Sequence, residues 1–358
     1  MKYWDFQITE KIRRGYFSAT YFNRTKKILE GENNRNVAVM QLFQKNEGSV
    51  MCGVEEVIEL FRIGAGYWEG EEWVSKFDEI KIESLTDGDE LHSGESVMHI
   101  TGPYVYFAHL ESLYLGILAR RTLVASNTKR AVNAAGGKPV IFFADRFDHF
   151  FNQEGDGYAA HIGGAAGVCT QAHTAWWNGI ASGTIPHSLI AMNGGNTIKA
   201  AELFIKYNKG VNLIVLVDFE NDCVKTSVEA AKALGEDLWG VRLDTAQNMI
   251  DKSLENQGSG IRNQELYGVN PILVKNVREA LDKEGFNNVK IVVSGGFNAE
   301  RIKRFEEEKV SVDVYGVGSS LVHGQNDFTA DIVTMDWKRI AKTGREFRDN
   351  PRFKLVKP

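Results

Sequence analysis

Charged side chains and glycine-rich turns stand where short apolar runs of this sequence end. These groups are Asp145-Arg146, His187, Asp218, Arg242 with Asp244, Ser294-Gly295-Gly296 and Gly316-Val317-Gly318-Ser319. Guanidinium and carboxylate groups clamp oxygens and offset charge, imidazole is a reactive base near neutral pH, and glycine lets backbone N–H groups approach a phosphate. If the runs are parallel strands, their carboxyl ends meet at one edge. The sequence therefore predicts one site there, for an anionic substrate.

His187 follows a proline in the stretch GTIPHSLIAMNGG (183–195), which otherwise holds small, apolar and hydroxyl residues. Two interpretations fit this position. The side chain is either a buried histidine bonded to a backbone carbonyl or a reactive imidazole at the mouth of a site. The residue types alone leave both interpretations open.

Arg242 and Asp244 lie two residues apart in VRLDT and point the same way if this run is a strand. One interpretation is an internal ion pair. In the other, the arginine clamps a charged oxygen of a sugar phosphate, while the aspartate accepts ribose hydroxyls or offsets positive charge on a ring.

Two late glycine turns, Ser294-Gly295-Gly296 and Gly316 to Ser319, follow successive apolar runs. Either the glycines only make tight turns between strand and helix, or their amides hold a phosphate. The last two strand loops of a (β/α) barrel commonly bind phosphate. The adjacent pair therefore favours a phosphate site at Ser294, Gly295, Gly296, Gly316, Gly318 and Ser319.

Two aromatic stretches also carry arginine. FFADRFDHFF (142–151) places Arg146 among phenylalanines, which suits either an exposed charged loop or a slot for a flat anionic ring. GYFSATYFNRTKKIL (15–29) holds Tyr21, Arg24 and Thr25 and reads by itself as the start of an amphipathic helix.

The elements that would position these groups alternate between strand and helix after Lys138. Apolar runs that do not alternate indicate strands buried on both faces, hence a parallel sheet covered by helices. A strand near Gly179–Thr184 is expected as well. With no GxGxxG opening the first unit, a (β/α) barrel is favoured over a doubly wound sheet. The expected strands lie at 140–145, 212–218, 240–244, 289–296 and 312–319, and the expected helices include 196–208 and 298–309.

The expected fold class is α/β: an incomplete (β/α) TIM-like barrel with a smaller, β-rich α+β N-terminal domain joined to it by a long helix. The turns in 85–107 indicate the β-rich domain over 1–109, and helical spacing begins at Leu110. The linking helix is expected over 110–137 and the barrel over 138–325. The segment 326–358 opens with strand-like alternation and is expected to return to the N-terminal domain.

Composition excludes several classes of protein. The chain has 358 residues and a net charge of −5, so nothing draws it to nucleic acid or to an anionic membrane. No apolar run approaches the length of a membrane span, and the N-terminus has no signal-peptide core. Cys52, Cys169 and Cys223 show no metal-binding or disulfide spacing. We therefore expect a soluble, cytoplasmic protein without a dedicated metal site.

Several motifs together resemble the nicotinate phosphoribosyltransferases, within the wider group that includes the nicotinamide and quinolinate phosphoribosyltransferases. The resemblance covers most of the chain, and the order and spacing of the motifs make it specific. They are YFNRT, DGDELHSGESVMHITGPY, LESLYLGILARRTLVASNTKR, DRFDH, GTIPHSLI, GVRLDT, VSGGFN and YGVGSS.

The resemblance implies transfer of 5-phosphoribose from phosphoribosyl pyrophosphate to the ring nitrogen of nicotinate, with release of pyrophosphate, in NAD biosynthesis. Mg²⁺ would ride on the pyrophosphate. It also implies a homodimer or higher homo-oligomer in which the N-terminal domain of one subunit helps to close the partner's site. ATP is a further substrate in many relatives, in which the matching histidine is phosphorylated; other relatives work without ATP, and both readings stay open.

By the same matching, His187, Arg242 and Asp244 are the catalytic candidates. Tyr21, Arg24 and Thr25 would hold the pyridine and its carboxylate, with Arg146 and Asp218 as further substrate-binding candidates. The two glycine turns would hold the 5-phosphate, and Ser188 with nearby backbone could fix which nitrogen of His187 is free.

The sequence departs from the family pattern in three places. Asp-Thr-Ala-Gln (244–247) stands where relatives have Asp-Ser-Gly-Asp, which weakens any role for Thr245 or Gln247. Residues 163–171 lack the aspartate of nicotinamide-selective relatives, which favours a carboxylate substrate. The cysteine-rich C-terminal zinc element of some archaeal-type members is missing.

Alternatives to nicotinate transfer remain. A quinolinate or nicotinamide phosphoribosyltransferase would use the same site. More distant alternatives are a sugar-phosphate enzyme on the same barrel and a non-catalytic nucleotide-binding paralogue. No strand end named above carries the lysine that a Schiff-base aldolase needs.

Overall fold

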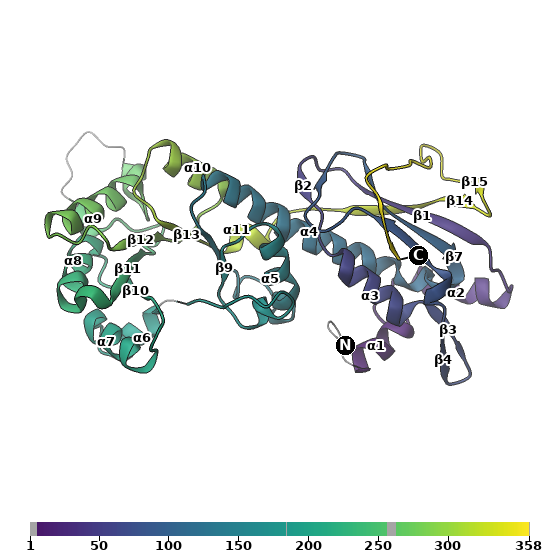
Figure 1. The fold of residues 1–358 in the computed structure, drawn as a ribbon, viewed down its shortest axis with the longest axis horizontal. Coiled ribbons are helices and arrows are strands. Elements are labelled where there is room, and N and C mark those ends of the chain that lie inside the picture. Colours follow the sequence, from purple (N-terminus) through teal and green to yellow (C-terminus); the bar gives the residue numbers. More distant parts are fainter. Residues whose placement is uncertain (1–5, 184, 256–262, 358) are drawn as a thin grey trace. The chain divides into compact units, whose positions relative to one another are not determined.

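The chain divides into two compact units, and Figure 1 labels the helices and strands of each. The computed structural model describes residues 6–183, 185–255 and 263–357. The first unit takes Met1–Ser126 and Gly324–Pro358, and the barrel unit takes Asn127–His323. The division falls inside the long helix α4 (Glu111–Ala134). None of the helices within the described ranges has the length and apolar character of a membrane-spanning segment.

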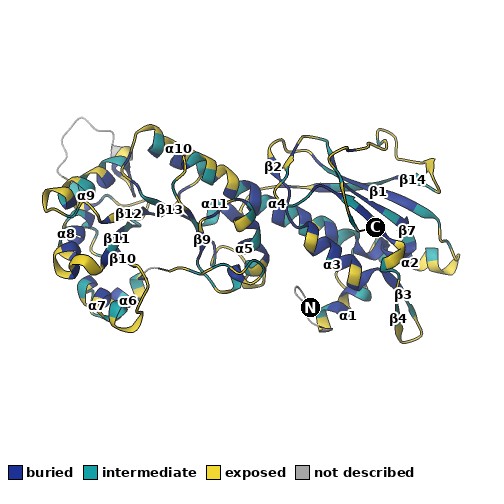
Figure 2. Ribbon diagram, in the orientation of Figure 1, coloured by how far each residue is buried: buried dark blue, intermediate teal, exposed yellow. Residues whose placement is uncertain are grey.

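A six-stranded antiparallel sheet forms the first unit, in the order β15-β14-β1-β7-β5-β16. Strands β1 (Val37–Gln44) and β7 (Ser96–Pro103) pair at its centre and are almost wholly buried (Figure 2). Their apolar side chains pack with α3 (Val54–Gly64) and α4 in one core that includes Met40, Ile100, Phe61 and Tyr114. Burial of this area stabilises the unit.

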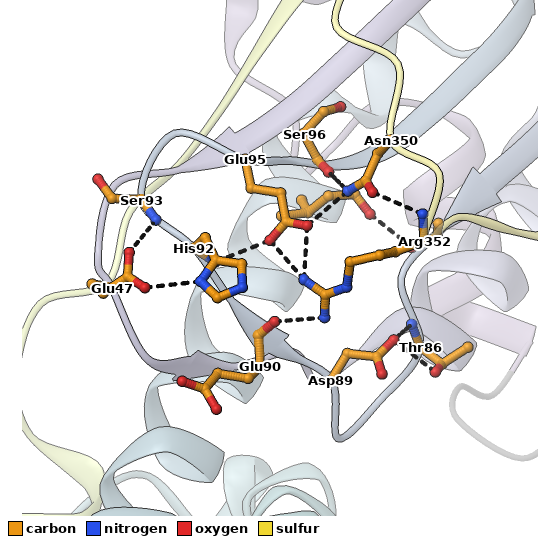
Figure 3. Close-up of polar contacts among 12 residues, drawn as sticks. Glu47, Thr86, Asp89, Glu90, His92, Ser93, Glu95, Ser96, Asn350 and Arg352 are labelled. Atoms are coloured by element: carbon orange, nitrogen blue, oxygen red, sulfur yellow. Dashed lines mark hydrogen bonds and ion pairs between the residues drawn. The ribbon is translucent and has the colours of Figure 1, made fainter.

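The C-terminal segment belongs to this sheet. Strand β14 (Phe328–Met335) pairs with β1, and β16 (Lys354–Lys357) pairs with β5 (Lys81–Ser84). Polar contacts hold the chain just before β16, as Figure 3 shows. Arg352 donates to both carboxylate oxygens of Glu95 at 2.8 and 3.0 Å, and Asn350 donates to the same carboxylate at 2.8 Å.

Shorter elements complete the first unit. They are α1 (Phe6–Arg13), α2 (Thr20–Gly31), β15 (Lys338–Arg339), the pair β2 (Ser49–Val50) with β6 (Glu90–Leu91), and the hairpin β3 (Gly66–Glu69) with β4 (Glu72–Ser75).

The barrel unit holds a six-stranded parallel sheet in the order β10-β11-β12-β13-β8-β9. The predicted incomplete (β/α) barrel with a smaller α+β domain is thus confirmed. The strands are β8 (Val140–Phe142), β9 (Gly167–Val168), β10 (Leu213–Leu216), β11 (Leu238–Leu243), β12 (Lys290–Val293) and β13 (Val314–Val317).

One expected strand, near Gly179–Thr184, does not form. Ala181 makes a single parallel bridge to Val168, and Thr184 lies outside the described residues. The glycines at 179 and 183 disfavour an extended run, because glycine loses the most backbone freedom on ordering. The ring of strands is therefore open between this segment and β10 within the described ranges.

Helices follow the strands, and several begin at an Asn or Asp whose side chain accepts from a backbone N–H of the first turn, as at Asn196, Asp222, Asn270 and Asn298. In Figure 1, α8, α9 and α10 lie outside the strands. The helices of this unit after α4 are α5 (Gln153–Ile162), α6 (His187–Met192), α7 (Thr197–Tyr207), α8 (Cys223–Leu234), α9 (Pro271–Lys283), α10 (Ala299–Glu307) and α11 (Ser319–Val322).

Candidate active site

A cavity of about 370 Å³ opens where strands of the barrel unit end. Four predicted residues line it: Arg146, His187, Arg242 and Asp244. They come from the loop after β8, the start of α6 and the end of β11. Residues separated by about a hundred positions in the sequence thus share one hollow, as expected for the carboxyl edge of a barrel.

His187 is fixed by a carboxylate. Its Nε2 lies 3.1 Å from each of the two side-chain oxygens of Asp218, two residues beyond the end of β10. The Asp218 side chain is only 9% exposed, whereas that of His187 is 45% exposed at the cavity. The hydrogen bond to Asp218 raises the pKa of His187, although partial burial opposes the shift. With Nε2 engaged, Nδ1 is the ring nitrogen available for chemistry.

Arg242, Ser294 and Asp244 form a closed set of hydrogen bonds. Nε of Arg242 donates to Oγ of Ser294 at 2.8 Å, and Oγ donates to Oδ1 of Asp244 at 2.7 Å. Nη2 of Arg242 donates to Oδ2 of Asp244 at 3.1 Å. The internal ion pair therefore exists, and it lines the cavity. The Phe143 ring lies 5.1 Å from the guanidinium carbon and adds a cation–π contact.

The Ser294-Gly295-Gly296 turn stands beside this set. Gly295 and Gly296 have φ of +86° and +70°, in the left-handed region that glycine adopts without strain. Arg301 of α10 donates to the carbonyl oxygens of both glycines, at 2.7 and 3.2 Å, so these oxygens are turned toward the Arg301 side chain. The two amides have no acceptor among the residues that the structure describes. This leaves two N–H donors for an anion.

Gly316, Gly318 and Ser319 lie at the end of β13 and the start of α11. A methyl group on Gly316 or Gly318 would come within 2.5 Å of ring carbons of Phe143 or Phe147, respectively, so glycine permits this close packing. In the described chain, neither glycine turn is part of the wall of the 370 Å³ cavity itself. They lie next to it, because Ser294 contacts the lining residue Arg242 and Gly316 packs against the lining residue Phe143.

Arg146 is exposed, with its guanidinium carbon 5.7 Å from the centre of the Phe147 ring. Its neighbour Asp145 also lines the cavity, and Sγ of Cys169 donates to Oδ1 of Asp145 at 3.3 Å. Burial, with Asp145 nearby, raises the pKa of Cys169 to about 12, so this thiol stays protonated. The carboxylate of Asp145 thus contacts Cys169, which belongs to the segment 163–171, although that segment has no acidic residue of its own.

Tyr21, Arg24 and Thr25 lie on α2 of the first unit. Tyr21 is 63% exposed, Arg24 is also exposed, and Oγ1 of Thr25 donates to the Tyr21 carbonyl at 2.9 Å. Exposure leaves the Tyr21 and Arg24 side chains available to a ligand or to a second subunit. Their role in binding stays a prediction.

The sequence did not single out several residues of this site. Phe143 and Cys169 line the cavity, the Phe219 ring lies 6.5 Å from that of His187, and Arg301 holds the glycine turn. The aromatic run 142–151 signalled Phe143 weakly. Nothing in the spacing of Arg301 distinguishes it from a surface helix residue.

The chain is similar in sequence to known phosphoribosyltransferases. The family model described as quinolinate phosphoribosyl transferase, N-terminal domain, matches residues 19–122. A nicotinate phosphoribosyltransferase of Mycobacterium tuberculosis is 30% identical over 258 residues, which are 70% of this chain and 52% of that protein. The chain spans about half the length of the curated relatives it matches.

Two solved structures share the fold over nearly the whole chain. The nicotinate-nucleotide pyrophosphorylase of Pyrococcus furiosus superposes with a TM-score of 0.79 and 32% identity, over 94% of this chain and 79% of that one. The human nicotinic acid phosphoribosyltransferase gives a TM-score of 0.65 at 15% identity, over 90% and 75% of the two chains. At 15% identity, the similarity to the human protein concerns the fold alone.

Proposed function

We propose that this chain, which belongs to the nicotinate phosphoribosyltransferase family, transfers phosphoribose from phosphoribosyl pyrophosphate to nicotinate. The products are nicotinate mononucleotide and pyrophosphate, as a step of NAD biosynthesis. The observation that carries the proposal is the convergence of Arg146, His187, Arg242 and Asp244 on one cavity beside two glycine turns. A cavity of about 370 Å³ falls in the size range of small-molecule sites.

The donor would be bound through its two anionic ends. The amides of Gly295 and Gly296 and the Gly316–Ser319 turn would receive the 5-phosphate, while Arg242 and the exposed Arg146 would receive the pyrophosphate. Mg²⁺ would enter on the pyrophosphate and neutralise part of its charge. The described residues contain no group of three or more His, Cys, Asp or Glu side chains that could hold a metal by themselves, and Asp244 is the catalytic-candidate carboxylate facing this space.

The reaction breaks the bond between the anomeric carbon and the pyrophosphate oxygen, and the ring nitrogen of nicotinate forms the new bond to that carbon. Positive charge develops on the ribose as pyrophosphate leaves with the bonding electrons. Arg242 would stabilise the leaving group, and Asp244 would offset the charge on the ribose. Because Ser294 joins both side chains, they are held in place before the substrate arrives.

His187 is the residue through which ATP would be coupled to transfer. Its Nδ1 would attack the γ-phosphorus of ATP, ADP would leave, and a phosphohistidine would form. Three features support this role: Asp218 holds Nε2, the ring is half-exposed at the cavity, and the side chain lies at the first residue of α6. Asp218, placed beforehand among the substrate-binding candidates, would then act by positioning His187.

Asp145 favours a second acceptor. A carboxylate beside Cys169 repels the carboxylate of nicotinate but accepts a hydrogen bond from the amide of nicotinamide. Arg146 and Arg242 favour nicotinate, so the preference depends on which charge lies nearer to the ring substituent. Quinolinate, with two carboxylates, would need more cationic contacts than nicotinate does.

The decisive experiment incubates the protein with phosphoribosyl pyrophosphate, Mg²⁺ and nicotinate, nicotinamide or quinolinate, with and without ATP, and measures the mononucleotide formed. We expect the highest kcat/KM with nicotinate and stimulation by ATP. His187→Ala should abolish the stimulation and spare some basal transfer. A higher kcat/KM with another ring overturns the choice of acceptor, and an unchanged ATP response in His187→Ala overturns the phosphohistidine.

Sharing of sites between subunits is part of the proposal, because the exposed side chains of Tyr21 and Arg24 lie in the first unit. In a head-to-tail dimer these residues would close the barrel site of the partner. Mixing Tyr21→Ala and His187→Ala chains, each of which should lack the ATP-stimulated rate, should then restore part of that rate, since one of the two sites in each mixed dimer is intact. Failure of mixed dimers to regain this rate would contradict sharing.

A further inference from the structure

A second cavity, of about 360 Å³, lies in the first unit between α1, α2 and the hairpin of β3 and β4. It is basic, although the whole chain has a net charge of −5. Its wall includes four cationic side chains, one carboxylate and two aromatic rings. These are Arg13, Arg14, Lys26, Lys27, Glu30, Trp68 and His109.

The cations of this wall are only partly neutralised. Glu30 pairs with Lys26 at 3.1 Å, and Glu10 serves both Arg13 and Arg14 at 3.9 and 3.4 Å. Lys27 makes no ion pair among the described residues. Four cations thus face two carboxylates, Glu10 and Glu30, which leaves an excess of two positive charges.

Two of the cations are available to a ligand and two are engaged. The ammonium group of the buried Lys26 donates to the carbonyls of Gly66 and Val105, at 2.7 and 2.8 Å, and pairs with Glu30. Arg13 donates to the Ile63 carbonyl at 2.9 Å. Arg14, with a side chain 62% exposed, stacks over the Trp68 ring at 4.5 Å, and Lys27 is exposed.

His109 gives independent evidence for a ligand. It is 1% exposed and forms part of the cavity wall, yet neither ring nitrogen has a hydrogen-bond partner of normal geometry among the described residues. The Gly64 backbone lies close enough to favour the protonated form, but burial and the nearby Lys26 lower the pKa of His109 to about 3. The ring is therefore neutral and carries one unused N–H. Nε1 of Trp68 is buried and unpaired as well.

Buried N–H groups are almost always paired in folded proteins, so unpaired donors in a cationic wall mark the place of an acceptor. We propose that this cavity is a binding site for a phosphate group, distinct from the barrel site, with Arg14 and Lys27 supplying charge and His109 and Trp68 supplying neutral N–H donors. A dianion with several acceptor oxygens matches this mixture of converging donors. The proposal does not depend on the activity of the barrel site.

The site uses a different face of α2 from the predicted pyridine contacts. Asn23, Lys26, Lys27 and Glu30 recur at helical spacing and face the cavity. Tyr21, Arg24 and Ile28 follow the same period on a neighbouring face, and Tyr21 and Ile28 are exposed. A phosphate ligand here would therefore contact the helix that carries Tyr21 without occupying the predicted pyridine contacts.

The test follows the ring ¹⁵N signals of His109 in the full chain labelled at histidine. Inorganic phosphate, pyrophosphate and adenosine monophosphate are titrated separately, and sodium chloride is the control for ionic strength. Arg242→Gln provides a background with the barrel site impaired. The test variant is Arg14→Ser with Lys27→Ser. The matched control is Lys275→Ser with Lys303→Ser, which removes the same charge from exposed helix positions.

We expect a saturable shift of the His109 signals with at least one phosphate compound, in wild type, in Arg242→Gln and in the matched control. The probe that binds most tightly identifies the source of the phosphate group. Arg14→Ser with Lys27→Ser should weaken binding by tenfold or more, on the order expected for losing two charge-assisted contacts. Since both side chains are exposed, the variant should fold, as circular dichroism would show.

Three results would overturn the proposal. They are His109 signals that do not respond to any of the three probes, a response that sodium chloride reproduces, and a response that the double substitution leaves unchanged. The first two would mean that the cavity holds water alone. The third would place the anion outside the cavity.

Discussion

Nε2 of His187 lies at the same distance, 3.1 Å, from both carboxylate oxygens of Asp218. This contact holds Nε2 against the carboxylate, while the imidazole itself lines the cavity. It also ties α6 to the end of β10, so the position of the histidine is set by the barrel strands and not by its own short helix.

Replacing Asp218 by Asn should lower the pKa of His187, because the hydrogen bond to this carboxylate is the main cause of the upward shift. The ring pKa can be measured by NMR titration. Glu220→Gln, an exposed change two residues away, should leave it nearly unaltered. An unchanged His187 pKa in Asp218→Asn would show that the pair does not set the titration.

The same pair predicts the direction of two pH effects. A raised folded-state pKa adds stability below the unfolded value of about 6.5, and this contribution disappears as the pH rises through the folded pKa. Phosphorylation needs neutral Nδ1, so ATP-dependent labelling of His187 should increase as the pH rises through the same value. Labelling that falls over this interval would contradict the assignment of the nucleophile.

Arg242→Lys keeps the charge but cannot donate to Ser294 and Asp244 in the present fork. We expect kcat/KM to fall by about 10²- to 10³-fold, the loss typical of one preorganised donor in an active site. Arg304→Lys, at an exposed helical ion pair, is the control and should retain activity. A variant with near wild-type kcat/KM would remove Arg242 from the stabilisation of the leaving group.

Gly295 and Gly285 share the same backbone φ of +86°, which makes their alanine substitutions a matched pair. Each should cost roughly 1–2 kcal/mol of unfolding free energy, because an L-residue is strained there. Only at Gly295 would the new methyl carbon lie 3.2 Å from Oδ1 of Asp244, whereas nothing lies within 4 Å at Gly285.

We therefore expect Gly295→Ala alone to raise the KM for phosphoribosyl pyrophosphate, as measured by steady-state kinetics. Equal KM values in the two variants would place the 5-phosphate away from this turn.

Asp145→Asn should raise the ratio of kcat/KM for nicotinate over nicotinamide, on the order of tenfold, because it removes a like charge facing the acceptor carboxylate. Competition assays with both rings measure this ratio. Asp148→Asn removes the same charge from the same loop, outside the cavity wall, and should change the ratio little. A ratio unmoved by Asp145→Asn would show that the acceptor ring binds elsewhere in the cavity.

The parallel strands could be predicted because each is a short apolar run buried on both faces, and the two-residue period placed Arg242 and Asp244 on one side of β11. The glycine turns were found for the same reason, since they follow directly on such runs. The expected strand near residue 180 was wrong, because an extended run interrupted by glycines made one bridge only.

The partner of His187 could not be predicted in this way. Asp218 lies 31 residues away, and its role depends on rotamers and on the spacing of two neighbouring elements, neither of which leaves a periodic trace. Arg301 was missed for a similar reason. Its bonds to glycine carbonyls depend on the path of the turn, not on the amphipathic pattern of α10.

The insertion of the whole barrel between β7 and β14 bears on how the chain matures on the ribosome. During translation the barrel can be complete while β1 still lacks the neighbour that arrives with Phe328–Met335. Until then one edge of a highly apolar strand is open to pairing with other nascent chains. Chaperone demand should therefore be concentrated in the interval before Phe328–Met335 emerges.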